Sequence, residues 1–469
     1  MITPLHVLTI IFTLALATGL GLYSKRRVRS ASDFAVGGRK ISGPVVAGTI
    51  VGTLVGGAST IGTAQLAFQY GFSAWWFTLG GGLGCLILGL ALAGPLRRSG
   101  ASTGPGFLAR VYGPPAGTLA TLFSSLGIVL NIVGQILAAV ALLTSTLNLT
   151  PPVAALLAVL VMIGYVVFGG VWSAGLVGSL KVGLLYLSML GVGWLAYRLG
   201  GGLSGYQAAL PPYPWFSLFG RGLGPDLAAA FSLIVGVLST QTYLQAIFSA
   251  RDVRAARAGA LISAAIIPPL GLAGILVGLY MRLTAPEITP GQALPLFILH
   301  YLPDWFGGLV LATLFIATIG TGAGLVLGIS TMFTEEVYRK LLAPAASDGQ
   351  LLLVSRLAVM VFTGLGLLFV SGNLNSLILE WSFLSMGLRG ATLCLPLLAA
   401  IFWRRQVKPL AGVLAVGLGP LSTILWAMFG RRAVDPLYVG LAVSLGTMLL
   451  VSLLPVPKTA SLAGESVIE

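Results

Sequence analysis

The sequence predicts an all-α membrane protein that crosses the bilayer about 13 times. Of its 469 residues, 57% are apolar and only 8% are charged, and the mean hydropathy is +0.99. Because soluble domains are roughly 25% charged, most of this surface must face lipid. A soluble enzyme, a disordered chain and a disulfide scaffold are therefore excluded. Cys85 and Cys394 lie in separate apolar runs, so no zinc or redox site is expected.

Charged, Pro-Pro and Gly-rich breaks divide the chain into about 13 windows that are each long enough to span a bilayer. The first window has no basic residue before it and no cleavage pattern after it, so it is expected to remain as a helix. No stretch between windows would hold a soluble domain, which predicts one integral membrane unit over 1–469 with a cytoplasmic tail at 455–469. The expected spans are 3–23, 42–68, 73–96, 115–147, 152–169, 176–198, 226–249, 258–282, 305–333, 351–371, 375–402, 409–429 and 436–454.

Basic residues orient the chain in the membrane. If the N-terminus lies outside, 19 of the 26 Lys and Arg residues fall in cytoplasmic segments and five fall outside. Cytoplasmic loops of membrane proteins retain basic residues, so this asymmetry predicts an N-out, C-in topology. The net charge of +14 is then an orientation signal, and no nucleic-acid partner is expected. The two remaining basic residues, Lys181 and Arg389, fall within spans.

Two spans contain small, hydroxyl-rich stretches that predict broken helices. These are 52–60, which reads GTLVGGAST, and 236–242, which reads GVLSTQT. They lie five spans apart and run in opposite directions, as an inverted repeat of five helices over 42–198 and 226–402 would produce. Helices of this kind unwind at binding sites near the bilayer midplane. Close helix packing through small residues is the alternative interpretation.

Several motifs resemble those of the sodium:solute symporter family, which includes the bacterial proline permease and the sodium-galactose transporter. The motifs keep the family's order, and the resemblance covers nearly the whole chain. It implies a leucine-transporter-type fold with a 5+5 inverted repeat, an additional first helix at 3–23 and two additional helices at 409–454. It also implies alternating access, a small-molecule substrate and Na+ or H+ as coupling ion. The stretches are Asp33–Arg39, Ala58–Gly62, Tyr165–Gly170, Gln241–Gly259 and Thr334–Lys340.

The resemblance also implies a sodium site, and here the sequence departs from the family. Gly320 stands where a serine hydroxyl is usual, and Gly178 stands where some members have an aspartate for a second sodium. Sodium is a hard cation held by oxygen ligands, so the site is expected to be degraded. Carried over by position, the ion site falls on Gly52, Val55, Ala317, Gly320 and Thr321.

Lys181 aligns with a position that is usually glutamine. A lysine within a span is costly, by about 2.5 to 3.5 kcal/mol on insertion scales, and calls for a reason. In sodium-independent transporters that look like the same fold, a basic side chain on this helix takes the place of sodium. One hypothesis is that the Lys181 ammonium occupies the degraded site and either fixes the structure or couples protons. The alternative is that it snorkels to the cytoplasmic headgroups.

The resemblance does not extend to the family's known substrate residues. Ser59 and Thr78 replace the glutamine and glutamate that bind sugar, and Leu54 replaces the aspartate of the proline permease. Neutral donors at half-helix ends suit a carboxylate, which favours a small organic acid or amino acid. Interhelical hydrogen bonding is the alternative role for each candidate. The candidate substrate residues are Ser59, Thr60, Thr78, Gln135, Thr240, Gln241 and Gln245.

The sequence thus predicts a secondary active transporter of the sodium:solute symporter type in the plasma membrane of a prokaryote, with no enzymatic activity and no cofactor. A sodium-independent, proton-coupled transporter or exchanger in which Lys181 replaces sodium is the alternative within this class. A membrane sensor built on the same fold is the alternative from another class. The oligomeric state stays open.

Overall fold

The computed structural model describes residues 2–25, 39–430 and 434–454. Within these ranges the chain is helical, without a strand, which confirms the predicted all-α class. The predicted tail 455–469 and most of the Asp33–Arg39 motif lie outside the described residues. The side chains of 167–179, which include part of the Tyr165–Gly170 motif and Gly178, lie outside them as well.

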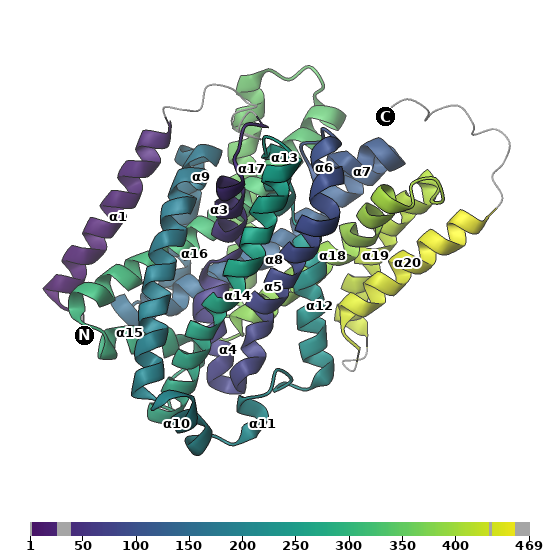
Figure 1. Ribbon diagram of the computed structural model, residues 1–469. Helices are drawn as coiled ribbons and strands as arrows, with labels where there is room; N and C mark the ends of the chain where they lie inside the picture. The colour runs from purple at the N-terminus through teal and green to yellow at the C-terminus, as the bar shows by residue number, and fades with distance from the viewer. Residues whose placement is uncertain (1, 26–38, 431–433, 455–469) are drawn as a thin grey trace.

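The first half of the chain forms α1 through α11, together with three short 3-10 or π segments (Figure 1). Its elements are α1 (Pro4–Lys25), α3 (Gly43–Leu54), η2 (Ala58–Gly62), α4 (Thr63–Tyr70), η3 (Gly71–Trp75), α5 (Trp76–Ile87), η4 (Leu88–Leu92), α6 (Ala93–Arg98), α7 (Gly104–Tyr112), α8 (Pro114–Leu147), α9 (Pro151–Leu199), α10 (Gly202–Ala209) and α11 (Pro212–Trp215).

The second half repeats the pattern of long helices joined by short connections. Its elements are α12 (Leu223–Ser239), α13 (Gln241–Ser249), α14 (Val253–Thr284), η5 (Pro290–Gln292), α15 (Ala293–Tyr301), α16 (Asp304–Met332), η6 (Phe333–Leu342), α17 (Asp348–Ser371), α18 (Ile378–Phe402), α19 (Pro409–Phe429) and α20 (Pro436–Leu453).

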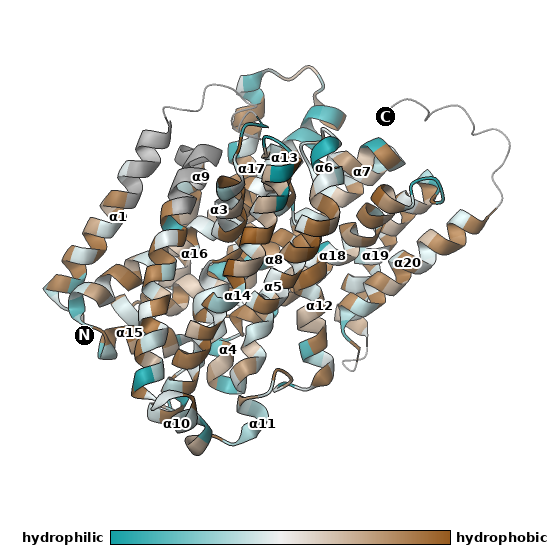
Figure 2. Ribbon diagram, viewed as in Figure 1, coloured by the Kyte–Doolittle hydropathy of each residue, from teal (hydrophilic) through white to brown (hydrophobic). Residues whose placement is uncertain are grey.

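By length and composition, nine helices of the described residues are able to cross a membrane, or ten if α12 and α13 form one bent span. Shorter apolar helices cover Pro4–Leu16, Gly43–Leu54 and Pro151–Val166. Apolar residues dominate the middle of the bundle, and hydrophilic ones gather toward its ends (Figure 2). These elements fall on the predicted windows, while the count of 13 and the N-out orientation stay predictions.

Two connections differ from the predicted boundaries. The windows 152–169 and 176–198 run together as the single element α9. Between the windows 42–68 and 73–96 the chain reverses at Gly71 without a loop, because η3 follows α4 directly. Gly71 has φ +61°, and a Cβ atom there would lie 2.0 Å from the carbonyl oxygen of Trp215. Only glycine fits this turn. The gap between the two predicted windows therefore corresponds to a turn in the backbone and not to a loop.

Both predicted helix breaks are present. α3 ends at Leu54, and Val55 is extended (φ −91°, ψ 103°) before η2 begins at Ala58. α12 ends at Ser239, and Thr240 is extended (φ −82°, ψ 123°) before α13 begins, with a bend of 42°. Each break therefore leaves helix ends inside the bundle, where backbone groups need partners other than the helix.

The first break depends on glycine at two positions. A Cβ atom on Gly57 would lie 2.4 Å from the Cβ of Ala138 in α8, and one on Gly56 would lie 2.4 Å from the Oγ1 of Thr321 in α16. α8 and α16 are among the most buried helices of the bundle. The broken segment is thus clamped between two buried helices, α8 and α16.

We expect Gly57→Ala to destabilise the protein by about 1 to 3 kcal/mol, because the added methyl group overpacks a rigid contact. Gly164→Ala in α9 is the matched control, since a Cβ atom there meets nothing within 4 Å. Cys85 and Cys394 are buried, so a thiol-reactive fluorophore reports the melting temperature in detergent. Equal melting temperatures for the two variants would contradict the clamp.

Candidate functional site

Lys181 lies in the second half of α9 and points into the bundle. Its side chain is only 3% exposed. The Nζ atom donates to the carbonyl oxygen of Gly52 at 2.5 Å and to Oγ1 of Thr321 at 2.6 Å. None of the ion pairs among the described residues involves Lys181. The ammonium is therefore held by neutral oxygen atoms of α3 and α16, and not by headgroups at the end of α9.

The break in α3 explains why these oxygen atoms are free. In a continuous helix the Gly56 N–H would bond to the carbonyl of Gly52. Here it donates to Oγ of Ser59 at 2.9 Å, so the Gly52 carbonyl is left for Lys181. The hydroxyl of Thr321 lies 3.4 Å from the carbonyl oxygens of both Gly52 and Val55. The positions expected to hold sodium are thus gathered around the Lys181 ammonium.

The remaining two ion-site positions lie on α16. Ala317 is one turn before Thr321 and is buried. Gly320 faces the lysine, because a Cβ atom there would have the Cδ of Lys181 as its nearest neighbour, at 3.9 Å. Gly320 therefore leaves open space beside the lysine stem where a serine would place a hydroxyl. Thr318, one turn from Thr321, has a buried hydroxyl without a hydrogen-bond partner among the described residues.

Three candidate substrate residues surround the first break and are already engaged. Ser59 and Thr60 donate to the carbonyl oxygen of Gly56, at 3.0 and 2.9 Å. Gln135 of α8 accepts from the Gly57 N–H at 3.0 Å. All three side chains satisfy the backbone of the break. They position it whether or not they also contact substrate.

The other four candidates do not form one cluster. Thr240 occupies the second break, donates to the Gly236 carbonyl at 2.6 Å and accepts from Nη1 of Arg389 at 2.8 Å. Gln241 accepts from the Gly104 N–H at 2.9 Å. Thr78 lies against α14, 3.5 Å from the Pro268 carbonyl oxygen. Gln245 lines a separate cavity.

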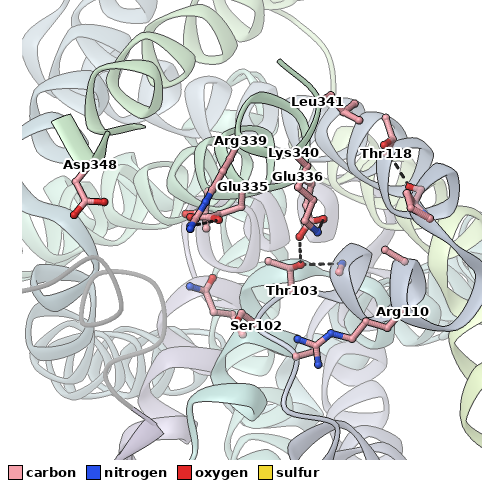
Figure 3. A pocket seen from close by; sticks show the side chains of 16 residues that line it. Ser102, Thr103, Arg110, Thr118, Glu335, Glu336, Arg339, Lys340, Leu341 and Asp348 are labelled. Carbon is pink, nitrogen blue, oxygen red and sulfur yellow. Dashed lines mark hydrogen bonds and ion pairs between the residues drawn. The ribbon is translucent and has the colours of Figure 1, made fainter. Parts of the chain in front are cut away.

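That cavity has a volume of about 780 Å³ and lies at one end of the bundle. The same end carries Arg39, Arg97 and Arg110, which donate to the backbone of Gly100, Arg251 and Ser99, and we call it the basic end. Figure 3 shows the side chains of η6 at the cavity wall together with Ser102 and Thr103, which precede α7, and Arg110 of α7. Thr103 donates to Glu336 at 3.0 Å, and Glu336 accepts from Lys340 at 2.5 Å.

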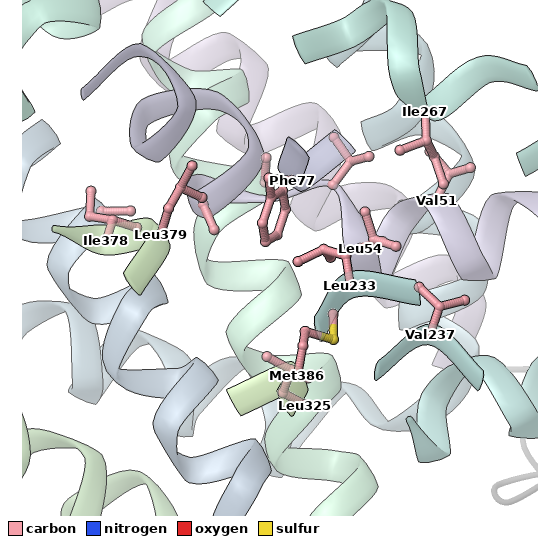
Figure 4. Packing of buried hydrophobic residues seen from close by; sticks show 14 of the residues in the cluster. Val51, Leu54, Phe77, Leu233, Val237, Ile267, Leu325, Ile378, Leu379 and Met386 are labelled. Atoms are coloured by element: carbon pink, nitrogen blue, oxygen red, sulfur yellow. The ribbon is translucent and has the colours of Figure 1, made fainter. Parts of the chain in front are cut away.

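Apolar side chains fill the region between the two breaks. Leu54 of α3, Phe77 of α5, Leu233 of α12 and Met386 of α18 pack together there (Figure 4). None of the residues that line the cavity at the basic end belongs to either break.

Arg389 contacts the second helix break, which its position in the sequence did not predict. The span 375–402 carries two charged residues, Glu380 and Arg389, which lie nine residues apart in the sequence. The structure places Glu380 in the first turn of α18, on the surface, and Arg389 in the fully buried interior. Arg389 donates hydrogen bonds to Ser385 and Thr240. Serine and threonine are common in this sequence, so the residue types alone do not predict that they contact Arg389.

The sequence comparisons show the family of this chain. Residues 34–415 match the sequence model of the Sodium:solute symporter family. The high-affinity proline transporter PutP of Bacillus subtilis (strain 168) is 25% identical over 442 residues, which cover 87% of this chain and 89% of the relative.

Solved structures confirm the leucine-transporter-type fold. An outward-open, substrate-bound Na+-coupled sialic acid symporter aligns with a TM-score of 0.74 at 18% identity, covering 96% of this chain and 97% of that one. Mhp1, a nucleobase-cation-symport-1 family transporter, aligns with a TM-score of 0.57 at 12% identity, covering 90% and 96%. These relatives are transporters and not enzymes. The chain is an integral plasma-membrane secondary transporter and belongs to the sodium:solute symporter family.

Proposed function

We propose that this chain is a sodium-independent secondary transporter of a small organic acid or amino acid. In this proposal the Lys181 ammonium occupies the place where the family binds sodium. The observation that carries it is the pair of hydrogen bonds from Nζ to Gly52 and Thr321, two of the positions that the resemblance assigns to the ion. Proton coupling or exchange then replaces the sodium gradient.

Electrostatics supports the substitution. An ammonium and a sodium ion carry the same charge, and both bind oxygen atoms. The ammonium can therefore interact with the carbonyl oxygens at the α3 break as a sodium ion would. Two unit charges 4 Å apart repel by about 4 kcal/mol at an effective dielectric constant of 20. A sodium ion entering beside Lys181 would meet this repulsion and would lack a hydroxyl at Gly320. Both effects act against sodium binding.

The substrate class follows from charge and from the relatives. Lys181 and Arg389 are buried cations, and no ion pair among the described residues involves either of them. An interior with this charge favours an anionic group on the solute. Proline and sialic acid, which the names of two of the three similar proteins above mention, both carry a carboxylate. A carboxylate-bearing solute therefore fits the charge and these two proteins.

The proposal predicts that sodium does not stabilise the wild-type protein. A ligand that binds only the folded state raises the melting temperature in a saturable way. We expect no such rise when choline is replaced by sodium at constant ionic strength. A saturable sodium-dependent rise in the wild type would refute the proposal.

The double variant Lys181→Gln with Gly320→Ser tests the site from the opposite direction. It removes the ammonium and adds the missing hydroxyl, and a Cβ atom at Gly320 has room. We expect it to gain sodium-dependent stabilisation, of about 2.7 kcal/mol at 100 times the dissociation constant. Gly320→Ser alone is the control and is expected to stay insensitive to sodium, because the ammonium is still present.

Thr321→Val tests the hydrogen bond from Lys181. The change preserves shape but leaves a buried ammonium with one acceptor fewer, so we expect a loss of stability of about 2 kcal/mol. Thr313→Val on the same helix is the matched control, since among the described residues the buried Thr313 hydroxyl bonds to the Leu309 carbonyl of its own helix and to no other group. Equal melting temperatures for the two variants would mean that Thr321 does not support the ammonium.

A further inference from the structure

Arg389 is a fully buried cation whose contacts are all with neutral groups. Nε donates to the Ser385 carbonyl at 3.1 Å, and Nη2 donates to the Ser385 hydroxyl at 2.8 Å and to Sδ of Met386 at 3.3 Å. Nη1 donates to Oγ1 of Thr240 at 2.8 Å. A guanidinium has five N–H donors. In the described part of the chain these groups supply four contacts, one of them to a weakly accepting thioether.

Such an arrangement lacks a counter-ion. Buried charges in proteins are normally paired, because an isolated ion is expensive to remove from water. Basic residues inside membrane spans mark substrate or ion pathways for the same reason. The planar fork of arginine matches the two oxygen atoms of a carboxylate better than it matches single hydroxyl groups. The geometry around Arg389 is therefore that of a cation whose anion arrives from outside the protein.

The second helix break adds partial positive charge near Arg389. Thr240 is the residue between α12 and α13, and its hydroxyl donates to the Gly236 carbonyl, so it does not cap α13. No side chain caps the N-terminus of this nine-residue helix. A helix N-terminus carries a partial positive charge. Arg389 and the start of α13 thus present positive charge at the same point, which repels a second cation and favours an anion.

A short segment separates Arg389 from the cavity at the basic end. Ser102 and Thr103 line the cavity, and the next residue, Gly104, donates to the amide oxygen of Gln241. Gln241 follows Thr240 directly. Leu393, one turn beyond Arg389, would lie 3.2 Å from a Cβ atom on Gly104. Figure 3 shows Ser102 and Thr103 at the cavity wall, so the cavity comes near the second break through this segment.

We propose that Arg389, together with Thr240 and the N-terminus of α13, binds the carboxylate of the transported solute. This inference rests on the proposed function, because it names the group that recognises the organic acid or amino acid. The hydroxyl groups of Thr240 and Ser385 hold the guanidinium in place when the carrier is empty. A carboxylate then replaces the neutral contacts on Nη1 and Nη2 by two charge-assisted hydrogen bonds.

The test is ligand-dependent thermal stability of the purified protein in sodium-free buffer. The probes are choline salts of acetate, pyruvate, L-lactate and L-glutamate, with zwitterionic L-proline and L-alanine, and acetamide and L-lactamide as neutral counterparts. We expect at least one carboxylate probe to raise the melting temperature of the wild type in a saturable way while its amide does not. Arg389→Gln is expected to weaken that binding at least tenfold.

Two further variants keep the test decisive. Arg389→Lys retains the charge without the fork, so we expect weaker binding that still prefers acids to amides, and this variant stands in if Arg389→Gln does not fold. Arg356→Gln, on the exposed face of α17, is the control for a lost surface charge. The proposal is overturned if no carboxylate probe binds, if an amide binds equally well, or if both Arg389 variants bind within threefold of the wild type.

The two proposals fail separately in this design. Sodium stabilisation of the wild type would refute the role of Lys181 and would leave the carboxylate measurements, made without sodium, unaffected. Loss of carboxylate binding with sodium insensitivity intact would refute only the role of Arg389.

Discussion

The hydrogen bond from the Lys181 ammonium to the Gly52 carbonyl is the contact that joins α9 to the broken end of α3. This hydrogen bond forms because α3 ends at Leu54 and the Gly56 N–H donates to the hydroxyl of Ser59, which leaves the Gly52 carbonyl free to accept from Lys181. The carboxyl end of a helix carries partial negative charge, so a cation at this point is electrostatically matched. Gly56 and Gly57 allow α16 and α8 to approach closely enough to complete the site. One break therefore links the packing of α3, α8 and α16 to the position of a buried cation.

Much of this arrangement is readable from sequence because its causes are local. Runs of small and hydroxyl residues predict both breaks, and the structure has them at 55–57 and at Thr240. The hydropathy windows predict the helices, since lipid leaves backbone groups no partners other than those within a helix. The turn at Gly71 was not predictable in this way. Its reason is the Trp215 carbonyl, which lies far away in the sequence and close by in space.

The side-chain partners show where such inference stops. Lys181, Gly320 and Thr321 could be associated through the family resemblance, yet the direction of the ammonium is decided by the packing of α9 on α3 and α16. For Arg389 no pattern in the sequence indicated Thr240, because the two residues are separated by 149 positions. Hydrogen bonds between helices that are distant in sequence depend on how the helices are rotated relative to one another. The hydrophobic periodicity of a helix does not specify this rotation precisely enough to predict which side chains meet.

The two buried cations differ in how well the backbone matches them. Lys181 donates to one carbonyl oxygen at the end of α3, where the partial negative charge of the helix end stabilises the ammonium. Arg389 takes no carbonyl from the end of α12 and reaches this break only through the Thr240 hydroxyl, beside the N-terminus of α13. A cation that the backbone stabilises can remain in place as a permanent substitute for an ion. The N-terminus of α13 adds positive charge beside Arg389, so this cation gains most from a bound anion, and for this reason we propose the second break as the place of the solute carboxylate.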